Sequence, residues 1–184
     1  MYIDSTIYKG RPENISDRSD IEIKCYDFLD GTGINYYRID HEAAMTMEAC
    51  REVKSLLGLH ICKNLFLTTR NGKGLYLLCM PGDKEFHTSV VSKLIGTSRL
   101  SFAKPEVMEE LIHTSPGSAS ILGLMFDTES RVQLVIDKDI LTEGNFGCHP
   151  CRNTSSVKFS VDDLKNVVIP KLGHEPMIID IPNA

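Results

Sequence analysis

A lysine stands inside one of the most apolar stretches of the sequence, ICKNLFLTT at residues 61–69. Because side chains alternate between the two faces of a strand, Lys63 is expected to share a face with Ile61, Leu65 and Leu67. A charge on such a face is unfavourable unless an anionic or polar group meets it. The pattern predicts either a lysine that binds a ligand or an edge-strand lysine that reaches out to water.

A second group of reactive side chains lies in the stretch Cys-His-Pro-Cys-Arg-Asn-Thr at residues 148–154. A zinc site would need four ligands, and one pair of cysteines without a second pair nearby gives little support for it. A redox pair of Cys148 and Cys151 would be expected to open a helix, whereas the proline between them favours a turn. The third interpretation places His149 and Asn153 in a pocket as polar lining groups.

A glycine-containing turn, Ser-Pro-Gly-Ser at residues 115–118, is the third feature. Gly117, and Gly123 further along, would let a ligand approach the backbone closely, and free amides there could bind an oxyanion or a phosphate. The sequence has no G-x-S-x-G elbow, no P-loop and no H-E-x-x-H motif. Serine hydrolases, nucleotide kinases and zincins therefore lack their usual sequence support.

Length and composition fit one compact domain. The chain has 184 residues, 42% of them hydrophobic, which is enough to bury a core without disulfides or metals. No apolar run is long enough to span a bilayer, and residues 1–14 lack the pattern of a signal peptide, so the expected compartment is the cytoplasm. The six cysteines are accordingly expected to be reduced thiols.

The net charge of −5 argues against a protein that coats DNA or RNA without specificity. The segment around residues 84–104 is an exception, because its cations outnumber its carboxylates. The cations are Lys84, Lys93, Arg99 and Lys104, and the carboxylates are Asp83 and Glu85. Such an excess usually marks a solvated surface, but it is also what a local nucleic-acid contact requires.

The expected elements alternate between helices and strands. Residues 1–15 have no periodicity and are expected to form an arm that drapes over the fold or frays, which leaves residues 16–184 as the domain. Helices are expected at 16–31, 46–57 (opened by Thr46), 88–94, 105–112 and 161–168, the last ended or kinked by Pro170. Strands are expected at 36–40, 61–69, 74–80, 100–102, 121–127, 131–137, 144–148, 155–160 and 177–181, with Asn71-Gly72 forming a tight hairpin turn. The order shows no regular βαβ rhythm, so we expect an α/β (α+β) single domain with a mixed sheet flanked by helices.

Five blocks, read together and in order, resemble one family: CKNLFL (62–67), IGTSRLSF (95–102), TSPGSASILGL (114–124), HPCRNTSSV (149–157) and EPMIIDIP (175–182). The resemblance is to the free-standing prolyl-tRNA editing proteins. They are a branch of the YbaK-like superfamily that includes PrdX-type proteins and is related to the editing domain inserted in bacterial prolyl-tRNA synthetases. It extends from about residue 21 to residue 182 and implies a strongly curved mixed sheet, the YbaK/prolyl-tRNA-synthetase-associated domain fold.

The resemblance also implies roles for individual residues. Lys63 would bind the substrate near the terminal adenosine, and His149 would line the aminoacyl pocket, which makes these two the candidate catalytic residues. The candidate substrate-binding residues are Asn64, Gly117, Ser118, Gly123 and Asn153. Arg99 and Lys104 would contact the tRNA. The family needs no metal or other cofactor, and the hydrolytic water is activated largely by the ribose hydroxyl of the substrate itself.

The implied function is removal of alanine from mischarged tRNA(Pro), with the acceptor end of that tRNA, and prolyl-tRNA synthetase, as partners. The synthetase cannot reject alanine well, because the methylenes that alanine lacks are worth only about 1–3 kcal/mol. A second, smaller pocket that fits alanine and clashes with proline then removes the mischarged residue. The chain departs from the family pattern at His113, at His41-Glu42-Ala43 and at the two cysteines beside His149. These changes leave cysteinyl- or seryl-tRNA as alternative substrates, and a noncatalytic module that binds an amino acid or tRNA as an alternative function.

Overall fold

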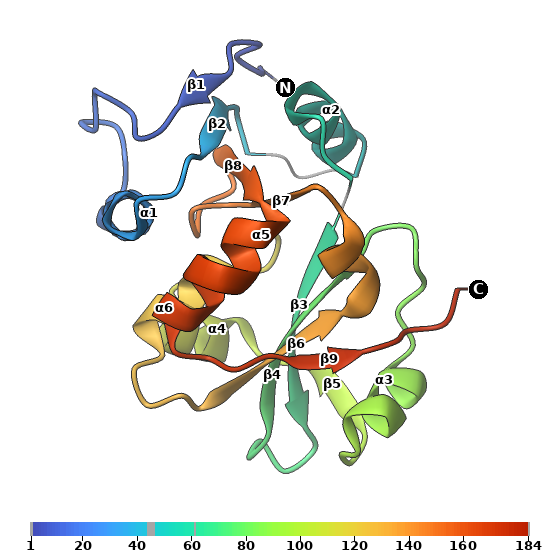
Figure 1. The fold of residues 1–184 in the computed structure, drawn as a ribbon. Coiled ribbons are helices and arrows are strands. Elements are labelled where there is room, and N and C mark those ends of the chain that lie inside the picture. The colour runs from blue at the N-terminus through green and yellow to red at the C-terminus, as the bar shows by residue number, and fades with distance from the viewer. Residues whose placement is uncertain (1, 44–46, 61, 184) are drawn as a thin grey trace.

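Two β-sheets lie one above the other in the computed structural model, which describes residues 2–43, 47–60 and 62–183 (Figure 1). The larger sheet has the order β5-β3-β4-β6-β9, and the smaller has the order β1-β2-β8-β7. The strands of the larger sheet are β3 (Cys62–Thr69), β4 (Leu75–Pro81), β5 (Leu100–Phe102), β6 (Val132–Asp137) and β9 (Met177–Ile179). Those of the smaller sheet are β1 (Tyr8–Lys9), β2 (Tyr37–Asp40), β7 (Asn145–Cys148) and β8 (Ser155–Ser160).

The larger sheet is mixed, as predicted: β3 runs antiparallel to β4 and β5, whereas β4, β6 and β9 run parallel. The second sheet was not anticipated, because its strands come from the two ends of the chain and only long-range pairing unites them. Thr46 and Ile61, which the sequence placed at a helix start and on the face of Lys63, lie outside the described residues.

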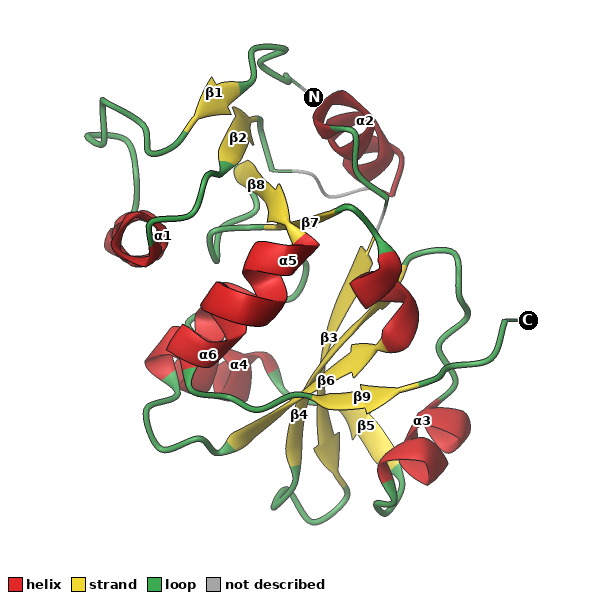
Figure 2. Cartoon of the chain, in the orientation of Figure 1, coloured by secondary structure: helices red, strands yellow, loops and turns green. Residues whose placement is uncertain are grey.

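Helices fill the space between the sheets and cover their outer faces (Figure 2). They are α1 (Asp20–Thr32), α2 (Met47–Leu57), α3 (Thr88–Ile95), α4 (Pro105–Ile112), the 3₁₀ helices η1 (Ile121–Phe126) and η2 (Lys138–Thr142), and a continuous run of α5 (Val161–Asp163), η3 (Leu164–Val168) and α6 (Ile169–Leu172). No described helix is both long and apolar enough to cross a membrane.

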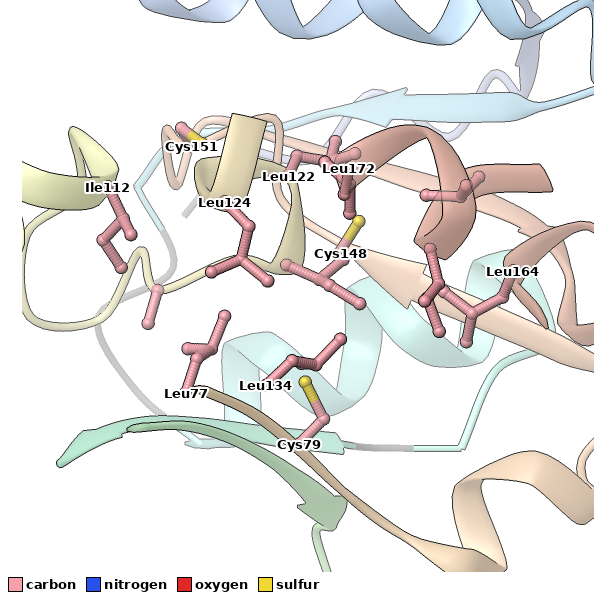
Figure 3. Close-up of a cluster of buried hydrophobic side chains, with 14 of the residues drawn as sticks. Leu77, Cys79, Ile112, Leu122, Leu124, Leu134, Cys148, Cys151, Leu164 and Leu172 are labelled. Carbon is pink, nitrogen blue, oxygen red and sulfur yellow. The ribbon is translucent and has the colours of Figure 1, made fainter. Parts of the chain in front are cut away.

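The main core lies between the two sheets (Figure 3). Leu77 and Leu134 of the larger sheet, Cys148 of the smaller sheet, and Leu164 and Leu172 of the C-terminal helical run are buried together there. A second cluster lies on the opposite face of the larger sheet, under α3, and a third lies between β2 and α2. The smaller sheet is therefore held between α2 on one side and the main core on the other.

The predicted hairpin is confirmed. Thr68 pairs with Leu75 at its closed end, and Gly72 has the positive φ of 70° that the turn requires. Asn71 fixes the turn, because its Oδ1 accepts hydrogen bonds from the hydroxyl of Thr69 at 2.7 Å and from the amide of Lys73 at 3.0 Å. This turn sets the register of the strand that carries Lys63.

One sequence-based assignment was wrong, and one helix runs further than expected. The apolar run 121–126 was expected to be a strand but forms η1, since the hydroxyl of Ser120 caps it by accepting the amide of Leu122 at 3.2 Å. The final helix was expected to end or kink at Pro170 but continues to Leu172. A π-type turn before the proline, closed by the amide of Ile169 on the carbonyl of Leu164, shifts the hydrogen-bond register and accommodates the missing donor.

The N-terminal residues pack against the smaller sheet. Tyr8 and Lys9 pair with Arg38 and Tyr37 as an edge strand, and Ile3 bridges to His41. The guanidinium of Arg38 lies over the ring of Tyr8 at 4.5 Å, which anchors this strand.

Candidate active site

Lys63 has the polar partner that the sequence required. Its Nζ donates to the backbone carbonyl of Lys84 at 2.7 Å, and the neighbouring side chains on its face, Leu65 and Leu67, belong to the core under α3. A neutral carbonyl accepts one hydrogen bond but does not cancel the positive charge. The ammonium thus retains donors for a ligand.

The loop that holds Lys63 is itself fixed by a buried ion pair. The side chain of Lys84 is 4% exposed and donates to both oxygens of Asp137 at 3.1 Å, to Asp139 at 2.7 Å and to the carbonyl of Ile181 at 2.6 Å. Burial opposes the charge, but the hydrogen bonds with Asp139 and Asp137 outweigh it and raise the pKa of Lys84. The carbonyl that meets Lys63 is therefore in a rigid position.

Asn64 projects to the other face of β3, as strand alternation requires, toward the side of Phe66 and the main core. Its Oδ1 is buried and has no hydrogen-bond partner among the described residues. A buried acceptor without a donor is unfavourable by about 1–3 kcal/mol. Such an atom is suited to accept a hydrogen bond from a bound ligand.

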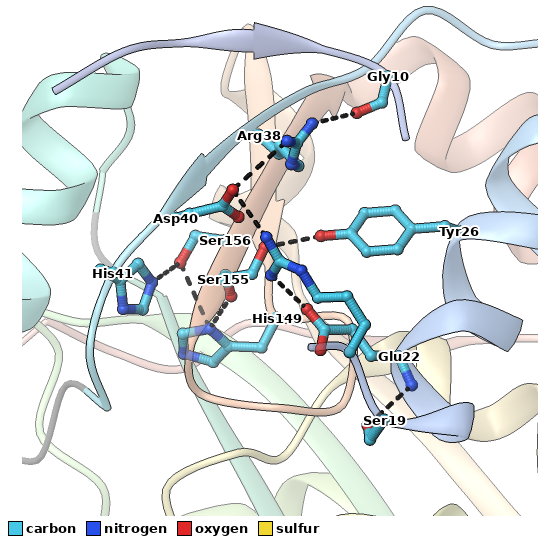
Figure 4. A network of polar contacts seen from close by, with 11 residues as sticks. Gly10, Ser19, Glu22, Tyr26, Arg38, Asp40, His41, His149, Ser155 and Ser156 are labelled. Atoms are coloured by element: carbon cyan, nitrogen blue, oxygen red, sulfur yellow. Dashed lines mark hydrogen bonds and ion pairs between the residues drawn. The ribbon is translucent and has the colours of Figure 1, made fainter. Parts of the chain in front are cut away.

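His149 lies in a hydrogen-bond chain that runs to a second histidine (Figure 4). Its Nδ1 is 2.8 Å from the carbonyl of Ser155 and 3.3 Å from the hydroxyl of Ser156, and that hydroxyl is 3.0 Å from Nε2 of His41. The Nδ1 of His41 is 2.8 Å from the carbonyl of Glu42. Since carbonyls only accept, both Nδ1 atoms carry the proton in the neutral rings, and the hydroxyl of Ser156 donates to His41.

This arrangement leaves Nε2 of His149 with its lone pair, and no described residue donates to it. Burial lowers the pKa of His149 to about 4. The hydrogen bond to the carbonyl of Ser155 opposes this shift, and the positive charge of Lys54 reinforces it. Burial also lowers the pKa of His41. Both rings are thus neutral at pH 7, and His149 presents an oriented acceptor.

The far side of β8 supports this loop. The hydroxyls of Tyr26 and Ser155 are 2.7 Å apart, which ties helix α1 to the residue whose carbonyl orients His149 (Figure 4). Arg18 joins Glu22 to Asp40 through two contacts of 2.8 Å, which hold the same helix against β2. The position of His149 therefore depends on the N-terminal third of the chain.

The glycine turn lies beside the His149 loop. Gly117 has a φ of 87°, and a Cβ there would lie 3.8 Å from Nδ2 of Asn153. The hydroxyl of Ser120 donates to the carbonyl of His149 at 2.5 Å, and the side chain of Ser118 is buried. The structure thus brings Gly117, Ser118 and Asn153 together with His149.

Gly123 has a different environment. It lies within η1, and a Cβ there would be 2.6 Å from the carbonyl of Ile112. This contact makes glycine necessary for the close packing of η1 on α4. Arg99 and Lys104 are exposed near β5 and are apart from the His149 loop.

The cysteines beside His149 face the protein interior. Cys148 and Cys151 are buried free thiols, and a hydrogen bond with Cys151, together with burial, raises the pKa of Cys25. Burial also raises the pKa of Cys148. Among the described residues, no group of three or more histidine, cysteine or acidic side chains could hold a metal.

Sequence reasoning overlooked Lys54, Ser156 and the role of His41. Lys54 is 9% exposed, and its amine donates to the sulfur of Cys62 at 3.3 Å, which in turn donates to the carbonyl of Gly147 at 3.3 Å. Its place between the buried Val53 and Leu57 of α2 is the one signal that could have marked it. This contact joins the start of β3 to β7.

A cleft of about 740 Å³ opens at this junction of the two sheets. Cys62, which precedes Lys63, and Gly147, which lies just before the His149 loop, are on its walls together with Lys84. Lys63, Asn64 and His149 are not among its lining residues, so the cleft borders the candidate residues rather than enclosing them.

Comparisons with known proteins identify the family of the chain. Residues 41–167 match the aminoacyl-tRNA editing domain family, and the chain therefore belongs to that family. Its predicted enzyme class, an aminoacyl-tRNA deacylase, is confirmed.

Two relatives and one solved structure are similar to this chain over most of its length. The chain is 29% identical over 140 residues to a prolyl-tRNA editing protein ProX of Acetoanaerobium sticklandii, a match that covers 76% of this chain and 85% of the relative. It is 31% identical over 146 residues to the Xenopus laevis prolyl-tRNA synthetase associated domain-containing protein 1, covering 76% and 84%. A crystal structure of a putative trans-editing enzyme for prolyl tRNA synthetase superposes with a TM-score of 0.65 at 16% identity, over 88% of this chain and 98% of that one. The fold prediction is thus confirmed.

Proposed function

We propose that the chain hydrolyses mischarged tRNA(Pro), and that alanine is the amino acid it removes. The observation that carries the proposal is the neutral, oriented His149 directly after β7, a strand that the contact of Cys62 with Gly147 joins to the start of the strand carrying the cationic Lys63. The names of its relatives, which refer to prolyl-tRNA editing and to prolyl-tRNA synthetase, support the choice of tRNA.

The reaction breaks the ester between the amino acid and the ribose of the terminal adenosine. Water adds to the ester carbonyl, the carbonyl oxygen becomes an oxyanion, and the bond to the ribose oxygen then breaks as that oxygen takes a proton. Lys63 stabilises the oxyanion or holds the adjacent ribose through the donors that Lys84 leaves unused. No protein nucleophile is required, because an ester is already reactive and positioning supplies much of the acceleration.

His149 acts through its Nε2 lone pair. A ring with a pKa of about 4 does not hold a proton at neutral pH, so it orients the water or the ribose hydroxyl by accepting a hydrogen bond. The proton then passes through the ribose hydroxyl and solvent to the leaving oxygen. A mechanism in which His149 and the ribose hydroxyl act in this way needs no paired nucleophile and base, in keeping with a sequence that shows no obvious pair of this kind.

The aminoacyl group is bound by Asn64, by Asn153 and by the turn at residues 117–118. The unpartnered Oδ1 of Asn64 accepts from the α-ammonium of the amino acid. Asn153 and the turn of Gly117 and Ser118 complete the lining of the aminoacyl pocket. Gly123 acts indirectly, by holding η1 against α4.

We favour alanine over cysteine and serine as the substrate because of where the residues that depart from the family pattern lie. Cys148 and Cys151 are buried, and His113 packs edge-on against Phe126 with ring centroids 4.6 Å apart. These departures from the family pattern therefore serve packing, and a small apolar pocket that rejects proline is sufficient. Substitution at His41 acts on the pocket only through Ser156 and His149.

The tRNA partner is expected to dock through its acceptor end, with Arg99 and Lys104 contacting phosphates. Prolyl-tRNA synthetase, which produces the mischarged tRNA, is the natural protein partner, and the cytoplasm is the corresponding compartment.

The deciding experiment measures release of labelled amino acid from alanyl-, cysteinyl-, seryl- and prolyl-tRNA(Pro). Alanine release that is lost in Lys63→Ala and retained in Lys73→Ala, a matched exposed lysine on the same hairpin, supports the proposal. Faster release of cysteine or serine would reassign the substrate. Binding of the charged tRNAs without release of any amino acid would favour the noncatalytic module.

A further inference from the structure

An exposed aromatic pair lies at the edge of the larger sheet. Phe102, at the end of edge strand β5, is 62% exposed, and its ring is tilted by 54° against that of Phe86 with centroids 5.6 Å apart. Phe86 is partly buried and packs on the core under α3, so it holds the exposed ring in place. Leaving a phenylalanine in water forgoes the burial of a large apolar area, which indicates a surface that something covers.

Phe102 shares a face with the candidate catalytic lysine. It is paired with Leu67 on β3, and alternation places Leu65 and Lys63 on the same face of that strand. Four residues of strand separate Lys63 from Leu67, a length of about 13 Å. The ring therefore lies a short distance from the ammonium, along the same sheet surface.

The positive charge near the ring belongs to this face as well. The ladder continues beyond β5, because the amide of Ala103 bonds to the carbonyl of Phe66, and Ala103 packs on the opposite, main core. Lys104 consequently projects on the side of Phe102 and is exposed. Glu85, the residue before Phe86, lies 3.0 Å from Nε2 of His87.

An exposed aromatic ring between two lysines matches the chemistry of an unpaired RNA strand. Bases stack on aromatic side chains, and ammonium groups meet the phosphates between them. We propose that Phe102, supported by Phe86, stacks on an unpaired nucleobase of the tRNA 3′ end upstream of the terminal adenosine, while Lys104 meets the adjoining phosphate. This inference rests on the proposed function, which places the terminal adenosine at Lys63.

The sequence supplies a direct probe for this contact, because it contains no tryptophan. Phe102→Trp introduces one fluorophore at the position of the proposed stacking contact. Ile178→Trp, the control, introduces one on β9 at the opposite edge of the same sheet, where the residue is 47% exposed. Each variant is titrated with an RNA hairpin that ends in an unpaired 3′ CCA, and with the same hairpin made blunt.

The expected result is quenching of the Phe102→Trp signal by the unpaired end only, and no quenching of Ile178→Trp. Phe102→Ala should weaken binding of uncharged tRNA roughly 5- to 150-fold, the range that corresponds to one stacked base. Phe102→Tyr should retain binding, and Phe102→Leu, which is apolar but cannot stack, should behave like the alanine variant.

Equal quenching by the blunt hairpin would overturn the proposal, as would tRNA binding that is unchanged in Phe102→Ala but reduced in Lys63→Ala. A change in sedimentation of Phe102→Ala, with tRNA binding intact, would instead assign the ring to contact between copies of this chain. The fluorescence experiment does not involve hydrolysis. If the chain releases no amino acid but the fluorescence of Phe102→Trp is still quenched by the unpaired end, the proposed function alone is contradicted.

Discussion

The two candidate catalytic residues are held in opposite ways. Lys63 lies on the larger sheet, where a local hairpin sets its position and one backbone carbonyl accepts from its amine at 2.7 Å. His149 lies at the end of the smaller sheet, where the carbonyl of Ser155 and the hydroxyl of Ser156 contact its ring directly. The same hydroxyl continues the chain to His41, which lies 115 residues before Ser156 in the sequence. The comparison teaches that a charge held by a single acceptor keeps donors free for a ligand, whereas a neutral ring is oriented by a chain of hydrogen bonds that fixes its tautomer.

Loss of the Lys63 charge tests the first half of the comparison and should have the largest effect. Lys63→Met, which keeps the apolar stem, should lower kcat/KM for alanyl-tRNA(Pro) by about 100- to 1000-fold, since it removes the donors that meet the developing oxyanion. Steady-state deacylation kinetics measure the effect, with Lys73→Met as the control. Activity above one-tenth of the natural level would remove Lys63 from the chemistry.

Replacement of His149 tests the second half. His149→Asn should lower kcat by about 100-fold, the lower end of what a positioned acid–base group contributes. Because the pKa of the natural ring is about 4, activity should be constant from pH 6 to 8 and should fall only as the pH approaches 4. A pH profile of single-turnover hydrolysis measures this, and a midpoint near 6.5 would mean that the ring is solvated rather than buried.

The lowered pKa of His149 also predicts how the free energy of unfolding depends on pH. The pKa of folded His149 is below its ordinary value, so folding favours the neutral ring, and this stability is present above about pH 6.5 and lost as the pH falls toward 4. Natural protein should therefore lose more unfolding free energy than His149→Asn between pH 7 and pH 4.5. Urea midpoints at the two pH values report the difference, and equal losses would contradict the prediction.

Disruption of the histidine chain should have a smaller effect. His41→Asn should lower kcat about 10-fold and move the acid limb of the pH profile upward, because a less fixed His149 is better solvated and its pKa returns toward the ordinary value. His87→Asn, at an exposed histidine, is the control. A uniform loss at every pH would indicate general damage to the fold instead of a positioning role.

The smallest effects are expected at the basic surface. Arg99→Ala and Lys104→Ala should each raise KM only about two- to fivefold and should reduce the dependence of log KM on log salt by roughly one unit, the signature of one lost phosphate contact. Titrations at several salt concentrations measure this, with the exposed Lys165→Ala as the control. An unchanged salt dependence would leave the two residues as ordinary surface charges.

Local signals in the sequence were sufficient for much of the fold and for the need of Lys63 to have a polar partner. Asn71-Gly72 fixed a hairpin, and the alternation around Lys63 required a polar partner, which the structure supplies as the carbonyl of Lys84. The apolar run 121–126 was misassigned because an entirely apolar segment fits a buried strand and a buried helix equally, and only the cap by Ser120 and the packing of Gly123 decide between them.

The environment of His149 could not be predicted, for a different reason. The motif located the residue, but its tautomer is set by the carbonyl of Ser155, its link to His41 passes through Ser156, and its low pKa comes from burial in the folded protein. The second sheet escaped prediction likewise, since the pairing of β2 with β8 leaves no local trace in either strand.

The buried Lys84 also has a consequence for how the protein is made. Its ammonium contacts Asp137 and the carbonyl of Ile181, and the second of these lies 97 residues later in the chain. During synthesis the N-terminal part emerges first, at about 5–20 residues per second, so Lys84 leaves the ribosome well before either partner exists. The loop that braces Lys63 can therefore close on both partners only after residue 181 has been translated.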